Sequence, residues 1–486
     1  MDTNSFSSLF SPRSIAFVGV SKDVRKWGFI ILNNIIRGQF QGSIYPVNPK
    51  EKEVLGLKVY PSVSEIPKPV DLAVIVVPPP AVSGVVAECV AKGIKSGIVI
   101  TAGFAELGGE GRRLQEEMVK IARGGGMRLV GPNCLGVLSM DVNMHVIMPS
   151  IHPMRGSLAI ISQSGNVVSS SIARGNRWGI GFSRCISSGN EADLHCEDFL
   201  EFLEEDHETK VIMAYVEGFR DGRRFFNIAK RVAKRKPIVM IKAGTTEAGA
   251  QAAKSHTAAL SGSDSACDAM CKQAGIIRVQ NIDDMFNIGA ALLHQPLPRG
   301  RRVGIITAGG GWGVLASDAC AKAGLDVVRL SDETIRELNE ILPAWWNRGN
   351  PVDLVTGFQR GGLRNCINTL LRSRQVDGVI VLGAGFRAVT ERLSRHPEAE
   401  SHVSSDFTSN PMVIDDIATF REIPTLMSRY GKPIVLASDS AAMAEVGWES
   451  GPFKVLRDME IMCYPLPDQA AEVLASLARY SEYLGR

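Results

Sequence analysis

One pattern recurs three times along the chain: an apolar segment with the character of a strand runs into a turn of small residues, and a helix follows. The apolar segments are residues 15–18, 158–161 and 303–306, and the turns after them contain Gly19, Ser162–Gly165 and Gly309–Gly313. Doubly wound α/β modules begin in this way, with the first helix N-terminus facing a ligand. Three such openings predict three modules, and a chain of 486 residues is also too long for a single core.

We therefore predict an α/β fold of three doubly wound modules. The first is Rossmann-like and spans residues 1–145, and two flavodoxin-like modules span residues 146–297 and 298–486. Prolines and cations in the linker Gln295–Arg302 mark the start of the third module. The run Asp71–Val77 has the continuous apolar character of a parallel strand that is buried on both faces.

Composition excludes several classes of partner. Hydrophobic residues make up 45% and charged residues 22%, as in ordinary globular enzymes, and a net charge of +3 gives no reason to expect nucleic acid or membrane binding. Aromatic residues, at 6%, are too sparse for base-stacking surfaces. No apolar stretch approaches the roughly 20 residues of a membrane helix, and the N-terminus lacks the features of an export signal. Nine scattered cysteines without a Cys-x-x-Cys pair fit buried thiols in a reducing cytoplasm, so we expect a cytoplasmic protein.

The predicted N-terminal strands all end in turns. The strand at Asp71–Val77 stops at three prolines, and the strand at Ser96–Thr101 ends in small residues before Phe104. Ligands of open α/β sheets bind outside the carboxyl ends of the strands, so these turns should ring one site. The candidate binding residues of this site are Gly19, Ser21, Lys22, Asn48, Pro49, Lys50, Val77, Pro78, Pro79, Ala102, Gly103, Phe104, Asn133 and Cys134.

The residues after the second predicted strand bear on the ligand. Asn48, Pro49 and Lys50 stand where a dinucleotide enzyme usually carries an acidic residue for the ribose hydroxyl. An amide and a cation there argue against plain NAD and for a ligand with an extra phosphate, and coenzyme A has a ribose 3′-phosphate. Gly19 also lacks the Gly-x-Gly-x-x-Gly spacing. An NAD(P)-dependent oxidoreductase of the same fold remains a rival, opposed by these residues and by the lack of a hydride-side acid/base set.

Two turns in the later modules have the character of anion sites, because they place amides and hydroxyls at a helix N-terminus. The candidate phosphate-binding residues are Ser162, Gln163, Ser164 and Gly165 in the second module, and Gly310 and Gly311 in the third. Glu217 ends an apolar strand just before a glycine. Burying a carboxylate at this position costs free energy unless it has a charge partner. The alternative is that Glu217 merely favours the N-terminus of the following helix.

The segment Lys242–Asp264 is dominated by Gly, Ala, Ser and Thr, and it carries His256. Such a segment buries little surface and should be mobile. A histidine on it suggests a group that must reach a partner and be phosphorylated or deprotonated there. The alternative is a flexible loop with an incidental histidine.

Ser255–Asp264 resembles the phosphohistidine loop of the nucleoside-diphosphate-forming acyl-CoA synthetases, relatives of succinyl-CoA synthetase. The resemblance extends over the chain in module order: Val77–Pro79, Ala102–Phe104 and Gly131–Cys134 are similar to the family's CoA-site segments, and Asn350–Asp353 to its Asn-Pro-x-Asp signature. It implies that the first module binds CoA, that His256 carries phosphate from an acyl phosphate to a nucleotide, and that Glu217 holds the histidine ring.

The resemblance covers only the CoA-binding part of the family, since the chain has no recognisable ATP-grasp module. It implies an alpha-type subunit of an ADP-forming acyl-CoA ligase, in a hetero-oligomer or homodimer. ATP or ADP and Mg²⁺ would be held by a separate ATP-grasp beta-type subunit. A non-catalytic regulator that binds CoA or a nucleotide is the alternative.

Five other residues are interpreted as structural or solvent-exposed rather than functional. Cys134 is expected to be a packed thiol rather than a nucleophile, because no activating group accompanies it in a motif. Cys267 and Cys271 share a helical face and suggest packing. His195 and His207 lie near acidic residues, but their spacing matches no common metal-ligand pattern, so no metal site is expected.

Overall fold

The computed structural model describes residues 3–249, 251, 263–354, 361–383, 385, 411–441 and 451–485. They form two compact units, Met1–Gly289 and Ala290–Arg486, each of which is described by itself.

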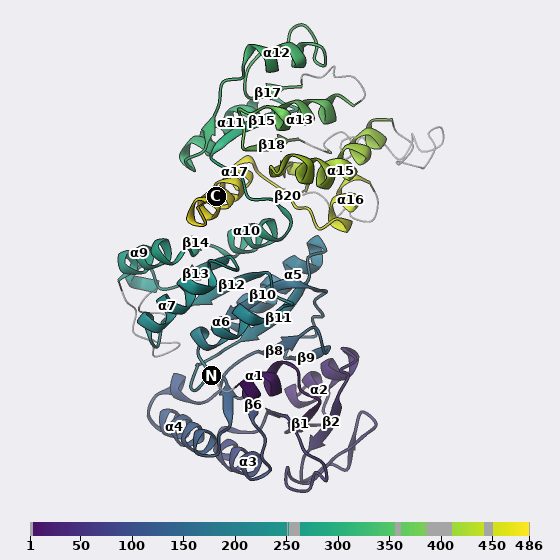
Figure 1. Cartoon of the computed structure of the whole chain (residues 1–486). Coiled ribbons are helices and arrows are strands. Elements are labelled where there is room, and N and C mark those ends of the chain that lie inside the picture. The colour runs from purple at the N-terminus through teal and green to yellow at the C-terminus, as the bar shows by residue number, and fades with distance from the viewer. Residues whose placement is uncertain are drawn as a thin grey trace. The chain divides into compact units, whose positions relative to one another are not determined.

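The N-terminal sheet of the first unit has the strand order β2-β1-β5-β6-β7, with every pair parallel. Its strands are β1 (Ser14–Val18), β2 (Ser43–Val47), β5 (Leu72–Ile75), β6 (Ser96–Val99) and β7 (Arg128–Val130). Its helices are α2 (Trp27–Arg37), α3 (Pro79–Ala91) and α4 (Gly109–Gly124), with a short turn η1 (Ala105–Leu107) before α4 and a hairpin of β3 (Glu53–Val54) and β4 (Leu57–Lys58). Helices α3 and α4 pack on each other, whereas α2 packs against β9 of the next sheet (Figure 1). Each of β1, β5 and β6 is buried along its whole length, as the apolar runs predict.

The second sheet has the order β14-β13-β12-β10-β11-β8-β9. Its parallel strands are β10 (Arg155–Ser162), β11 (Phe182–Ser187), β12 (Val211–Val216), β13 (Ile238–Lys242) and β14 (Ile277–Val279). A hairpin of β8 (Gly136–Ser139) and β9 (Met144–Ile147) adds antiparallel to β11, although most of it lies within the range predicted for the first module. The helices are α5 (Gly165–Trp178), α6 (Cys196–Glu205), α7 (Gly222–Val232), α9 (Asp264–Ala274) and α10 (Ile282–His294).

The two sheets of the first unit are joined by the segment Ser188–Leu194, which runs alongside the end of β7. Its amides donate to carbonyl oxygens of the first module, from Asn190 to Pro132 (2.9 Å), from Ala192 to Gly131 (3.0 Å) and from Leu194 to Leu129 (3.1 Å). The Asp193 carboxylate, fully buried, accepts from Arg123 (2.7 Å), Arg128 (2.9 Å) and the Leu129 amide (2.8 Å). The N-terminal helix α1 (Thr3–Phe10) also spans both modules, since Phe10 stacks on Phe202 with ring centroids 4.3 Å apart.

The second unit holds a third sheet of order β16-β15-β18-β19-β20, with β17 paired to β15. Its strands are β15 (Arg302–Thr307), β16 (Asp326–Val327), β17 (Val352–Asp353), β18 (Gly378–Leu382), β19 (Ile434–Ala437) and β20 (Cys463–Tyr464). Its helices are α11 (Gly310–Lys322), α12 (Asp332–Asn339), α13 (Gly362–Arg372), α15 (Pro411–Tyr430), α16 (Pro452–Asp458) and α17 (Pro467–Tyr483), with a 3₁₀ turn η4 (Asp439–Ala441).

All three doubly wound sheets share one topology. Numbered within each sheet, and leaving out β8, β9 and β17, the parallel strands follow the order 2-1-3-4-5 of the flavodoxin-like fold. The predicted fold class, three doubly wound α/β modules, is confirmed. Each sheet has its switch point beside its first strand, between β1 and β5, β10 and β12, or β15 and β18, where such folds bind ligands.

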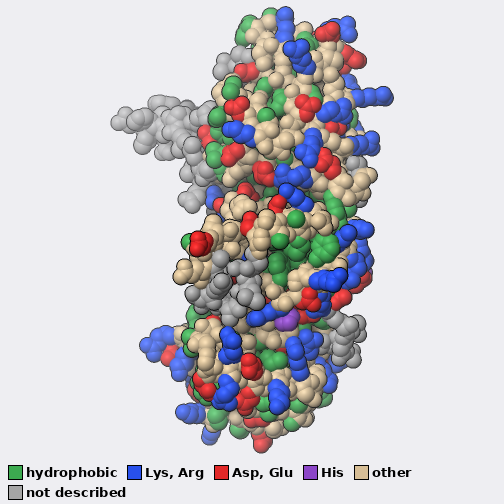
Figure 2. Space-filling model, turned by 90° about the vertical axis from the view of Figure 1, so that its left-hand side faces the viewer, with side chains coloured by type: hydrophobic (Ala, Val, Ile, Leu, Met, Phe, Trp, Pro, Cys, Tyr) green, Lys and Arg blue, Asp and Glu red, His purple; other side chains and the backbone are tan. Residues whose placement is uncertain are grey.

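Acidic and basic side chains are interspersed over the face that Figure 2 shows, in keeping with the small net charge. Within the described part of the chain, no helix combines the length and the apolar character needed to cross a bilayer.

Candidate functional site

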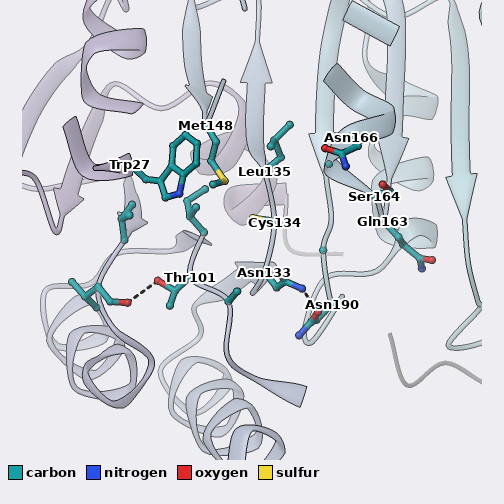
Figure 3. Close-up of a pocket in the computed structure, with 16 residues that line it drawn as sticks. Trp27, Thr101, Asn133, Cys134, Leu135, Met148, Gln163, Ser164, Asn166 and Asn190 are labelled. Atoms are coloured by element: carbon teal, nitrogen blue, oxygen red, sulfur yellow. Dashed lines mark hydrogen bonds between the residues drawn. The ribbon is translucent and has the colours of Figure 1, made fainter. Parts of the chain in front are cut away.

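A cavity of about 490 Å³ lies in the first unit where the carboxyl ends of β5 and β6 meet the N-terminus of α5 (Figure 3). Its apolar lining residues are Trp27, Val76, Val77, Ile100, Leu135 and Met148. Its amide and hydroxyl side chains are those of Thr101, Asn133, Gln163, Ser164, Asn166 and Asn190. None of the described residues that line it is charged, so an anion there would be bound by amides and by the positive end of the α5 dipole.

The Gly19 turn supports the floor of this site by close backbone contact. Gly19 has φ +99°, and a Cβ atom there would lie 2.3 Å from the carbonyl oxygen of Val76, a lining residue. Gly28 packs on the other side of the turn, where a Cβ atom would lie 2.1 Å from the Gly19 oxygen. Only glycine fits either position, so the two glycines bring α2 and β5 together.

The other polar residues predicted near this turn form a network of their own. Asn48 donates to the Val20 oxygen (2.6 Å) and accepts from the Lys50 amide (2.8 Å), which ties the β1 and β2 turns together. Ser21 accepts from the Asp23 amide (3.1 Å), and Lys22 pairs with Glu51 at 3.5 Å. Pro49 and Lys50 are exposed. None of Ser21, Lys22, Asn48, Pro49 and Lys50 lines the cavity itself, whose described lining is given above.

The turns after β5 and β6 are joined by a hydrogen bond. The Thr101 hydroxyl donates to the Val77 oxygen (2.7 Å), and both Val77 and Ala102 line the cavity. Pro78 precedes α3 and Pro79 begins it, as a proline at a helix start should. Gly103 has φ +105°, and a Cβ atom there would lie 2.8 Å from the Pro79 ring. Phe104 is fully buried in the core of the first module and is not among the lining residues.

Asn133 and Cys134 both line the cavity. The Asn133 amide donates to the Asn190 side chain of the second module at 3.2 Å. The Cys134 thiol donates to the Val99 oxygen (3.3 Å), and burial raises its pKa to about 12. A thiol that stays protonated at neutral pH is a packing group, as the sequence suggests.

At the α5 end of the cavity, the serines shape the turn. The buried Ser162 hydroxyl donates to the Ser164 oxygen (2.6 Å) and accepts from the Ser164 amide (3.1 Å). Ser164 and Gly165 line the cavity at the start of α5, and a Cβ atom on Gly165 would lie 2.8 Å from that of Leu135. Gln163 lines it too, but its side chain points away from the middle of the cavity in Figure 3.

Glu217 lies at the carboxyl end of β12 and is 7% exposed. Its amide donates to the Gln163 side-chain oxygen (2.6 Å), and its carbonyl oxygen accepts from the Lys242 ammonium (2.7 Å). Burial and the nearby Glu217 carboxylate raise the pKa of Tyr215. His256 lies outside the described residues, so the predicted pairing of His256 with Glu217 stays a prediction.

Gly310 and Gly311 begin α11 in the second unit. The turn before this helix has the same hydrogen-bond pattern as the turn at Ser162. The Thr307 hydroxyl donates to the Gly309 oxygen (2.7 Å) and accepts from the Gly309 amide (3.2 Å). Asn350 bridges β15 and the end of β16, donating to the oxygens of Val303 and Val328 at 2.9 Å each. This bridging gives the Asn-Pro-x-Asp stretch a structural role in the third sheet.

Several lining residues were not predicted: Trp27, Thr101, Leu135, Met148 and Asn190. A signal existed for Asn190, which lies in a polar turn after a strand of the second sheet. Trp27, Leu135 and Met148 carry no local signal, because an apolar side chain that lines a cavity looks in sequence like one in a core.

His195 is the N-cap of α6, and its amide donates to the Asp198 carboxylate (2.8 Å), while His207 is exposed. Among the described residues, no group of three or more His, Cys, Asp or Glu side chains is placed to hold a metal ion.

Family models place the chain in one class, CoA-dependent ligases of the succinyl-CoA synthetase type. A CoA binding domain matches residues 13–140, a succinyl-CoA ligase like flavodoxin domain residues 155–292, and a ligase-CoA domain residues 303–412. The acetyl-coenzyme A synthetase 1 of Candidatus Korarchaeum cryptofilum, solved with phosphate and ADP, superposes with a TM-score of 0.84 at 34% identity over 99% of each chain.

Two curated relatives from Pyrococcus furiosus extend the match. The alpha subunit of ADP-forming acetate–CoA ligase I is 37% identical over 99% of this chain and 98% of its own length. The alpha subunit of ADP-forming acetate–CoA ligase II is 42% identical over 77% of this chain and 81% of its own length. The chain belongs to the family of ADP-forming acyl-CoA ligases, and both of these relatives are named as alpha subunits. The predicted family and ligase function are confirmed, and nothing in the comparisons supports a non-catalytic regulator.

Some relatives are longer. The ADP-forming acetate–CoA ligase I of Archaeoglobus fulgidus is 41% identical over 77% of this chain, but the match covers 54% of that protein. The chain thus spans about half the length of some relatives that it matches.

Proposed function

We propose that this chain is the CoA-binding and phosphate-carrying subunit of an enzyme that converts acyl-CoA, phosphate and ADP reversibly into a carboxylic acid, CoA and ATP. The observation that supports it is the cavity, in which the strand ends of the CoA-binding module meet the N-terminus of α5. A thioester held by the first module and a phosphate held at the helix N-terminus would meet there.

The reaction has three balanced steps. A phosphate oxygen attacks the thioester carbonyl, the C–S bond breaks, and CoA leaves as acyl phosphate forms. The His256 imidazole then attacks the phosphorus and the carboxylate leaves, while Glu217 stabilises the positive charge that develops on the ring. Finally, ADP accepts the phosphoryl group and His256 is restored.

The residue roles follow the same division. CoA would be bound within residues 1–145 by the turns at Gly19–Lys22, Asn48–Lys50, Val77–Pro79, Ala102–Phe104 and Asn133–Cys134. Residues 146–297 would hold phosphate at the Ser162–Gly165 turn and carry His256. In residues 298–486, Gly310 and Gly311 would form a second anion turn.

The nucleotide and Mg²⁺ would be held by a separate ATP-grasp beta-type subunit, in a hetero-oligomer or with a homodimer of this chain. We place the protein in the cytoplasm, because all nine cysteines are buried free thiols, which suits a reducing compartment.

The test is labelling with radioactive phosphate. We expect the chain, given acetyl-CoA and labelled phosphate, to acquire an acid-labile label that a nucleotide-binding partner subunit discharges onto ADP. His256→Ala should abolish the label, whereas His207→Ala, at an exposed histidine, should keep it. A label that persists in His256→Ala would overturn the assignment, and a wild-type chain that never labels would overturn the proposed function.

A further inference from the structure

Gln163 sits between the cavity and the Glu217 turn, and its side chain is bonded to the latter. Its carbonyl oxygen accepts from the amides of Glu217 (2.6 Å) and Gly218 (3.2 Å), and its Nε2 donates to the Gly218 oxygen (3.0 Å). Three hydrogen bonds from one carboxamide to two consecutive residues fix the backbone from which the Glu217 side chain projects.

The Gln163 side chain also lies near the buried Glu191 carboxylate and favours its charged form. Glu191 is 2% exposed and has φ +50°, in the segment Ser188–Leu194 that joins the two modules. Its carboxylate accepts from the Ser188 hydroxyl (2.8 Å). Burial raises the pKa of Glu191 to about 7.

The bonds to Glu217 and Gly218 commit the carboxamide of Gln163 to that turn. Its oxygen accepts two of them and its Nε2 donates the third, and the backbone amide donates to the Tyr215 oxygen at 3.2 Å. A phosphate bound by Gln163 would have to displace one of these bonds and leave a polar group in a buried site unsatisfied, which costs about 1–3 kcal/mol. The geometry therefore favours a positioning role over the direct phosphate contact that the sequence suggests.

We propose that Gln163, hydrogen-bonded to the Glu217–Gly218 backbone, is a positioning residue that orients the Glu217 carboxylate for the step in which the histidine accepts phosphate. This inference rests on the proposed function, because it assigns Gln163 to the step in which His256 is phosphorylated. Gln163 acts only through Glu217 and touches neither phosphate nor CoA with its side chain.

The experiment is a double-mutant cycle on the single-turnover rate at which the full chain is labelled by acetyl phosphate, which bypasses the CoA step. Gln163→Met keeps the side-chain length without the hydrogen bonds. We expect it to slow labelling by at least about 10-fold, as Glu217→Gln does, while the Kd for CoA stays within about twofold. The double variant should be no slower than Glu217→Gln alone, since the two residues act as one unit.

A matched variant serves as the control. Ser169→Ala, on α5 outside the lining of the cavity, should change nothing.

The outcomes separate the two proposals. If wild type labels but the losses from Gln163→Met and Glu217→Gln multiply in the double variant, Gln163 acts independently and the inference fails alone. A full labelling rate in Gln163→Met, or a CoA affinity that falls in step with the rate, would also overturn it. If wild-type His256 is never labelled, the proposed function fails as well.

Discussion

Gly28 and Gly84 both lie within helices, but their surroundings differ. Comparing the same substitution at the two positions distinguishes the effect of residue type from the effect of packing. A Cβ atom on Gly28 would lie 2.1 Å from the Gly19 oxygen, whereas one on Gly84 meets nothing within 4 Å. In an open helix interior, alanine is favoured over glycine by roughly 0.5–1 kcal/mol. The same substitution should therefore have opposite signs at these two positions.

We expect Gly28→Ala to destabilise the first unit by about 2 kcal/mol and to weaken CoA binding, because α2 must move away from the turn beneath the cavity. Gly84→Ala should raise the urea midpoint slightly and leave CoA binding unchanged. Urea unfolding and CoA titration calorimetry measure both effects. Equal behaviour of the two variants would show that the Gly19–Gly28 contact does not support the site.

At the scale of elements, the segment Ser188–Leu194 decides how the two modules of the first unit form one site. It supplies Gly189 and Asn190 to the cavity lining, and Asp193 joins it to two arginines on α4 and β7. Because Asp193 is fully buried and accepts three hydrogen bonds, replacing one of its oxygens removes a charge that both guanidinium groups share.

Asp193→Asn should lower the free energy of unfolding by about 3 kcal/mol, the usual cost of breaking a buried ion pair, and should also lower CoA affinity. Glu110→Gln removes an exposed partner of Arg113 and should leave the midpoint unchanged. Chemical denaturation of both variants beside wild type is the measurement. If Asp193→Asn unfolds like Glu110→Gln, the segment is not held by this carboxylate.

For the molecule as a whole, acid stability is tied to a histidine pair. His145 on β9 is 5% exposed, and its Nδ1 lies 3.2 Å from that of His152. Burial, and then the nearby His152, lower the pKa of His145 to about 4, against 6.5 for the ordinary side chain. Between these values the unfolded chain binds a proton that the folded chain does not, so stability falls as the pH falls through this window.

We expect wild type to lose on the order of 2 kcal/mol of stability from this group between pH 7 and pH 4.5. His145→Asn should flatten that part of the profile, whereas His207→Asn, at an exposed histidine, should not. Urea midpoints across the pH range test this. An unchanged slope in His145→Asn would mean that His145 is protonated in the folded protein.

The sequence alone was enough for the architecture and most of the loops that form the site. Continuous apolar runs predicted β5 and β6, and the turns after them line the cavity through Val77 and Ala102. The same reasoning could not assign the hairpin β8–β9 to the second sheet, nor foresee that the Gln163 side chain bonds to the Glu217 turn 54 residues away.

What the sequence determined by itself is therefore local: strand periodicity, the turn chemistry at each carboxyl edge, and the family to which the chain belongs. The tertiary structure decided which edges meet, and so that Asn190, Trp27 and Met148 line one cavity and that Gln163 bonds to the Glu217 turn. The physical reason is the separation along the chain between the residues that make each contact. A turn is encoded by the residues that make it, whereas a contact across two modules depends on packing and hydrogen bonds between segments that no local pattern relates.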